Sequence, residues 1–186
     1  MSNILSSVVN GIKGGLKGAL EGSADLGSTI VNSVKEVATT TIKGTSDLVV
    51  KGIQVPASIV HGAIGGITDI GAGTIKLMKG IVDGAVQGAM DAGVEQKDAV
   101  KGSVAQALHS AQELGLDVAE VAVEAVNGSI NGVKQVGGDI TAATKNSIVA
   151  ALDAAKEIGS EAADSVKKAL TDSVKGAKEI LDEIKK

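Results

Sequence analysis

The sequence contains no phenylalanine, tyrosine or tryptophan, although 44% of its 186 residues are hydrophobic. Its apolar residues are therefore mainly valine, isoleucine, leucine and alanine. Aromatic side chains normally supply the largest buried areas of a globular core. Their absence favours thin, close contacts between regular elements over a thick core. The single proline, Pro56, leaves long stretches without a residue that interrupts helices.

Cysteine is absent, and so is arginine, because all 18 basic residues are lysines. Without cysteine the chain has no disulfide, no thiolate metal site and no cysteine nucleophile. Without arginine it cannot form the bidentate fork with which guanidinium groups bind phosphates or carboxylates. The net charge of −4 and a pI near 5.2 argue further against nucleic acid, which calls for a basic patch. We therefore expect no nucleic-acid partner.

Long hydrophobic runs are missing as well, since no stretch of 18 residues is free of lysine, aspartate and glutamate. This argues against a transmembrane helix. Residues 1–18 lack the basic segment and uninterrupted apolar core of a secretory signal. We expect a cytoplasmic protein, with export by a route that needs no signal peptide left open.

What the sequence does contain is a repeat of 22 residues. The phrase AKEI at Ala155–Ile158 returns at Ala177–Ile180, and apolar residues recur at the same step throughout. Within a repeat they are three or four residues apart, or about 3.67 per turn, which is an α-helical period made of two 11-residue units. The main apolar column holds Leu20, Ile42, Ile64, Val86, Leu108, Ile130, Leu152 and Val174.

The two borders of this apolar stripe differ in kind. One carries lysines, and acidic residues lie on the opposite face of the helix. The other is a column of small residues, in which the glycines are Gly22, Gly44, Gly66, Gly88, Gly132 and Gly176. Small residues in register let two helix backbones approach closely. Each interior glycine also costs roughly 1 kcal/mol of helix stability against alanine, so these helices need packing partners to persist.

The glycines allow two interpretations of helix length. Each could end a short helix, because Gly137-Gly138-Asp139 looks like a C-terminal glycine followed by an N-cap, and Asp117 to Glu120 resembles a capping box. Alternatively, the helices are long and continuous. We favour long helices, because the apolar pattern keeps its phase across nearly every glycine.

On this interpretation the fold is all-α, an elongated antiparallel helical hairpin or bundle of about eight repeats with close packing mediated by Gly and Ala. Residues 1–92 form a first arm, residues 93–97 a turn and residues 98–186 a second arm. The turn is predicted because Gln96 and Lys97 stand where apolar residues are expected. A break or kink is predicted near Pro56, which disfavours the helical conformation of the preceding Val55.

No catalytic, cofactor or metal site emerges. His61 and His109 stand in columns that otherwise hold polar residues such as Asp83 and Asn127, or Gln87 and Asn131, and we interpret these columns as the solvent face. The carboxylates repeat once per row on the same outer face, which is typical of solvated charge. The glycine-rich stretch at 11–18 lacks the Gly-Lys-Ser/Thr ending of a phosphate-binding loop.

The 22-residue period of two 11-residue units resembles the amphipathic repeats of exchangeable apolipoproteins, synucleins, perilipins and group 3 late-embryogenesis-abundant proteins. The segment AKEIGSEAADSVKKALTDSVKGAKE is also similar to uncharacterised bacterial repeat proteins rich in Gly and Ala. Glycine stands here where apolipoprotein repeats carry proline, and no row contains a KTKEGV-like core. Mean hydropathy is +0.24, whereas desiccation proteins are hydrophilic.

Two functional hypotheses follow for a non-enzymatic chain. The first is a structural protein that assembles with itself into a filament, sheet or shell, with the six glycines and the apolar column as contact surfaces. The second is an amphipathic coat protein that binds a lipid or storage-granule surface through its apolar stripe. An adaptor or stress-protection role is a third interpretation.

Overall fold

The computed structural model describes residues 25–44, 52, 54–70 and 73–184, and near the N-terminus residues 6, 9–11 and 13–15. From residue 25 onward this part of the chain forms helices and no strand, which confirms the all-α prediction. The helices are α2 (Leu26–Gly44), α3 (Gln54–Ile70), α4 (Thr74–Asp91), α5 (Gln96–Glu113), α6 (Val118–Gln135), α7 (Ile140–Ile158), α8 (Ser160–Ser173) and α9 (Ala177–Ile184).

Each 22-residue repeat in the middle of the chain forms one helix and one loop. The starts of α4, α5, α6 and α7 are 22 residues apart, and each helix is 18 or 19 residues long. The long continuous arms predicted from the sequence are therefore wrong. The loop at 92–95 does fall on the predicted turn, but residues 114–117 and 136–139 form equivalent loops. The chain does not divide into arms 1–92 and 98–186.

A glycine in each loop explains why the helices end. Gly93, Gly115 and Gly137 have positive φ angles of 93°, 67° and 73°, which side-chain-bearing residues adopt only with strain. In the first loop the Val94 amide donates to the Ala89 carbonyl at 2.9 Å, and the other two loops repeat this bond. The pattern is the Schellman motif, which closes a helix by satisfying its last carbonyls.

Aspartates begin two of the following helices. Asp117 accepts from the Glu120 amide and Asp139 from the Ala142 amide, each at 3.0 Å. These caps belong to the short-helix interpretation, which we had not favoured, and the structure bears it out. Pro56 lies in the first turn of α3, where its missing N–H costs no hydrogen bond. The prediction that it would force Val55 out of the helix is wrong, since α3 begins at Gln54.

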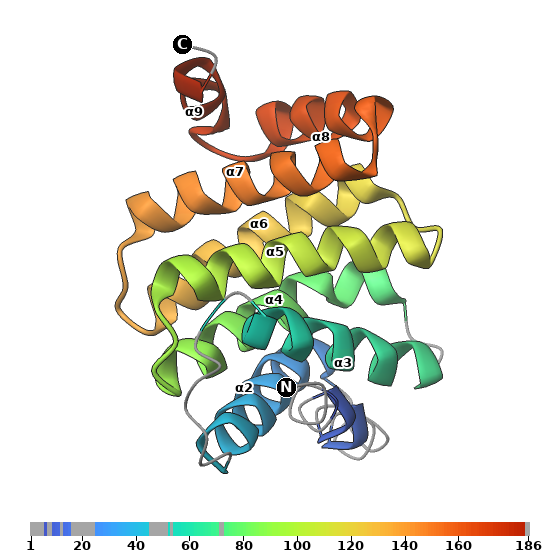
Figure 1. Cartoon of the computed structure of the whole chain (residues 1–186), viewed down its shortest axis with the longest axis vertical. Coiled ribbons are helices and arrows are strands. Elements are labelled where there is room, and N and C mark those ends of the chain that lie inside the picture. The colour runs from blue at the N-terminus through green and yellow to red at the C-terminus, as the bar shows by residue number, and fades with distance from the viewer. Residues whose placement is uncertain are drawn as a thin grey trace.

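The helices stack in two layers. Successive helices contact each other, and each helix also contacts the next but one, so that α2, α4, α6 and α8 form one layer and α3, α5 and α7 the other. In Figure 1 the stack rises from α2 at the bottom to α8 and α9 at the top. Neighbours within a layer run parallel. Residues such as Ile59, Met78, Ile81, Leu108 and Ile148 are fully buried between the layers.

Candidate functional site

The apolar column that we expected to join separate chains forms the core of a single chain. Ile64, Val86, Leu108, Leu152 and Val174 are buried, and Ile42 and Ile130 are partly buried against the core. Leu20 lies outside the described residues. The prediction that this column is an outer contact surface is therefore wrong, because helices of the same chain already cover it.

The glycine column is likewise used inside the chain. Around Gly88 of α4, a Cβ atom would lie 2.6 Å from the Ala38 Cβ and 2.8 Å from the Lys35 carbonyl oxygen of α2. Around Gly132 of α6, it would lie 2.8 Å from the Asp83 carbonyl oxygen of α4. The close backbone packing predicted for glycines occurs here, but between helices of one chain.

The other glycines of the column do not line a contact surface together. Gly66 is buried in α3, whereas Gly44 and Gly176 are exposed, and nothing lies within 4 Å of the Cβ position of either exposed glycine. Gly22 is outside the described residues. Self-assembly stays a prediction.

The outer side of α2, α4 and α6 carries a polar groove with a buried carboxylate at its floor. Asp83 is only 4% exposed, and its Oδ1 accepts from Gln87 Nε2 at 2.7 Å while its Oδ2 accepts from Asn131 Nδ2 at 2.5 Å. Gln87 is 6% exposed. Ser28, Val31, Asn32 and Gln135 complete a groove of about 280 Å³, which we call the Asp83 groove.

Sequence reasoning placed Asp83, Gln87 and Asn131 on the solvent face, and for Asp83 and Gln87 this is wrong. That interpretation treated α4 as a helix with one buried face. In the stack α2 and α6 flank α4 within its layer, and α3 and α5 cover its inner side. Only a narrow outer strip of α4 is left, and Gly132 brings α6 close enough for Asn131 to reach Asp83.

A second pocket adjoins the groove on the same face. It lies between α2 and the end of α4 and shares Asn32 with the Asp83 groove. Here the carboxylate is paired, because Lys35 Nζ lies 3.2 Å from Asp91 Oδ2 and both side chains are partly exposed. The polar face therefore extends along α2 from the Asp83 groove toward Thr39 and Thr40.

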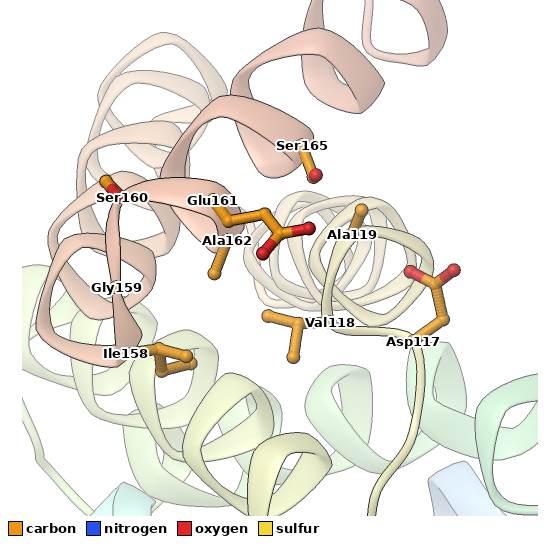
Figure 2. A pocket seen from close by; sticks show the side chains of 9 residues that line it. All are labelled: Asp117, Val118, Ala119, Ile158, Gly159, Ser160, Glu161, Ala162 and Ser165. Carbon is orange, nitrogen blue, oxygen red and sulfur yellow. The ribbon is translucent and has the colours of Figure 1, made fainter.

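Another pocket, of about 560 Å³, lies where the first turn of α6 meets the turn between α7 and α8. In Figure 2 the carboxylate of Glu161 extends between Ala119 and Ala162, while that of Asp117 lies at the far side of α6. Asp117 already caps α6, and Glu161 is exposed. Ser160 and Ser165 also line the pocket, but among the described residues neither hydroxyl is hydrogen-bonded to Glu161 or Asp117, so no nucleophile and base are in contact there.

The two histidines lie on the other layer. His61 is exposed beside Glu113 in a shallow pocket between α3 and α5. His109 Nε2 lies 3.1 Å from Glu157 Oε2, with both side chains substantially exposed. Among the described residues no three His, Cys, Asp or Glu side chains are grouped as metal ligands would be. Within the same residues, no helix combines the length and apolarity needed to cross a membrane.

Comparison with known proteins identifies a similar fold but no function. No family model matches the chain, and no curated protein matches it in sequence. The crystal structure of the de novo designed helical repeat protein DHR7 is similar over 92% of this chain and 95% of its own, with a TM-score of 0.56 and 20% identity. The fold is that of a helical repeat protein. At this identity the likeness concerns architecture alone.

Proposed function

We propose that this protein is a non-enzymatic helical-repeat adaptor that binds another polypeptide on the polar face of α2, α4 and α6. One observation carries the proposal: three parallel helices of one layer present two adjoining polar pockets that share Asn32. Helical stacks use such continuous faces as extended binding surfaces. The apolar stripe is buried inside the chain, which weighs against a coat that would lay this stripe on lipid.

The C-terminal end of the stack supports an adaptor over a polymer. In α8 only Val166 and Leu170 are buried, and in α9 only Ala177 and Leu181. The remaining residues of these helices include many exposed charged side chains, among them Glu161, Asp164, Lys168, Asp172, Lys178 and Glu179. Helices with so few buried apolar residues offer little surface on which another copy of the chain could stack.

Light scattering on a sizing column, followed by electron microscopy, distinguishes the adaptor hypothesis from the self-assembly hypothesis. We expect a single species at the monomer mass of 18.4 kDa over a wide range of concentration. Concentration-dependent growth into filaments, sheets or shells would refute the adaptor and support self-assembly.

Binding is tested by selecting displayed random peptides on the purified chain. Each enriched peptide is then mapped by the shifts it causes in backbone amide resonances. We expect the shifts to concentrate on α2, α4 and α6. Failure to enrich any peptide, or shifts confined to α3, α5 and α7, would refute the proposed binding face.

A further inference from the structure

The Asp83 carboxylate differs from the other carboxylates of the polar face. Among the described residues no lysine or histidine pairs with it, although it is 4% exposed, whereas the more exposed Asp91 pairs with Lys35. Buried charges in proteins are usually paired, because removing a charge from water is costly. Two amide groups donate to Asp83, but neither carries a compensating positive charge.

The hydrogen bonds of Asp83 leave acceptors available in the groove. A carboxylate has about four acceptor positions, of which Gln87 and Asn131 use two. A carboxylate can only accept, so both amides must turn their nitrogens toward Asp83. The amide oxygens of Gln87 and Asn131 are therefore the acceptors that each side chain retains for a further donor.

The size and rim of the groove restrict what fits. Its volume of about 280 Å³ is near the lower limit for a small-molecule pocket, which suits one side chain better than a larger ligand. The rim adds Ser28, Asn32 and Gln135, whose hydroxyl and amide groups can also accept hydrogen bonds. Several acceptors around one negative charge match a group with several donors and one positive charge.

We propose that the Asp83 groove binds the guanidinium group of an arginine side chain on another polypeptide. The inference rests on the proposed adaptor function and names the chemistry of its partner. A guanidinium group presents five N–H donors in a plane and forms bidentate bonds with a carboxylate. This chain contains no arginine, so a second copy of it cannot supply the group.

The negative charge of Asp83 is not needed to hold α4 against α6. To join α4 to α6, a neutral amide at position 83 would serve without burying a charge, since neutral replacements of buried ionic groups are often no less stable. The acidic side chain has an advantage once a cation reaches it. Charge-assisted bonds are roughly twice as strong as neutral ones, and more so in a desolvated groove.

The test uses the full-length chain and short fluorescent peptides of Gly and Ser with one central residue. That residue is arginine, lysine or citrulline, the last being a neutral analogue of arginine. Affinity is followed by fluorescence anisotropy at low and at physiological ionic strength. We expect the arginine peptide to bind most tightly and the citrulline peptide at least about tenfold more weakly.

Asp83→Asn removes the charge from the groove, and Asp153→Asn is the matched control. Asp153 is exposed on α7, in the other layer, and its replacement changes the net charge by the same amount. We expect Asp83→Asn to weaken the arginine peptide about tenfold or more and Asp153→Asn to leave its affinity unchanged. Equal effects of the two variants would overturn the proposal, and so would unchanged binding by Asp83→Asn.

A second variant tests the proposal even if Asp83→Asn fails to fold. Gln135 is exposed at the rim, so Gln135→Lys offers the groove an internal cation without disturbing the core. Gln112→Lys places the same charge on an exposed position of α5. Only Gln135→Lys is expected to reduce binding of the arginine peptide. Tight binding of the lysine and citrulline peptides would refute guanidinium recognition, while peptides selected on α2, α4 and α6 without arginine would leave the adaptor function standing.

Discussion

Replacing Gly132 by alanine is the most direct test of the close packing between α4 and α6. The added methyl group would lie 2.8 Å from the Asp83 carbonyl oxygen and 3.1 Å from the Val86 Cβ. Both atoms belong to or adjoin the backbone of α4, so no side-chain rotation relieves the contact. The two helices must move apart by some tenths of an ångström. This movement also loosens the neighbouring contact between Gly128 and Lys79.

The expected change combines two opposing terms. Alanine favours a helix interior over glycine by about 0.5–1 kcal/mol. Overpacking a close contact costs about 1–3 kcal/mol. The contact term is the larger, because the obstructing atoms are part of a helix that packs on both sides. We therefore expect Gly132→Ala to lower the free energy of unfolding by about 0.5–2 kcal/mol.

Gly65→Ala is the control, since Gly65 is also in a helix interior but is not tightly packed. The nearest atom to its Cβ position is Lys13 Cδ at 3.8 Å, an ordinary contact. This variant should gain about 0.5–1 kcal/mol from helix propensity. Urea unfolding followed by far-UV circular dichroism measures the free energy of unfolding of both variants. The dependence of this free energy on urea concentration should be the same in the variants and the unmodified chain. If Gly132→Ala is as stabilising as Gly65→Ala, the argument for close packing fails.

Other positions offer tests of single interactions. Ser103 is fully buried in α5, and its hydroxyl has no hydrogen-bond partner among the described residues, so Ser103→Ala should raise the free energy of unfolding by about 1 kcal/mol in urea. Gly137→Ala should lower it by about 1–2 kcal/mol although its surroundings are open, because φ is 73°. The hydroxyl of Ser28, 2.6 Å from Asp25 Oδ2, lowers the pKa of Asp25, and Ser28→Ala should raise that pKa in an NMR titration. The stabilisation linked to Asp25 is present above the usual Asp pKa and is lost as pH falls through the lowered value.

The sequence predicted the helical class and the repeat length, but the favoured helix length was wrong. An apolar pattern that keeps its phase across the glycines suggests that the helix continues through them. Five helical turns take 18 residues, and a four-residue loop completes the 22-residue unit. Every unit therefore shows the same columns whether the helix continues or not. The local signals were the better guide, because Asp117 and Asp139 do cap helices and Gly137 does end one.

The candidate site could not be predicted because its burial is a property of the layer. A single amphipathic helix would leave Asp83 and Gln87 in solvent. Their burial depends on the spacing of α2, α4 and α6, which follows from glycines on the facing sides of these helices. The sequence shows the small residues and the polar columns separately. Only the fold shows that the small residues bring the polar columns together.

This dependence links the stability of the stack to the proposed binding of arginine. Asn131 reaches Asp83 across the same interface that Gly132 keeps narrow, one residue away along α6. Moving α6 outward lengthens the 2.5 Å bond from Asn131 and admits water to the carboxylate. Water weakens the electrostatic attraction of a guanidinium group. Gly132→Ala should therefore weaken the arginine peptide under conditions where circular dichroism shows the chain fully folded, and Gly65→Ala should not. Unchanged affinity of folded Gly132→Ala for the arginine peptide would show that binding in the groove does not depend on the close packing of α4 and α6.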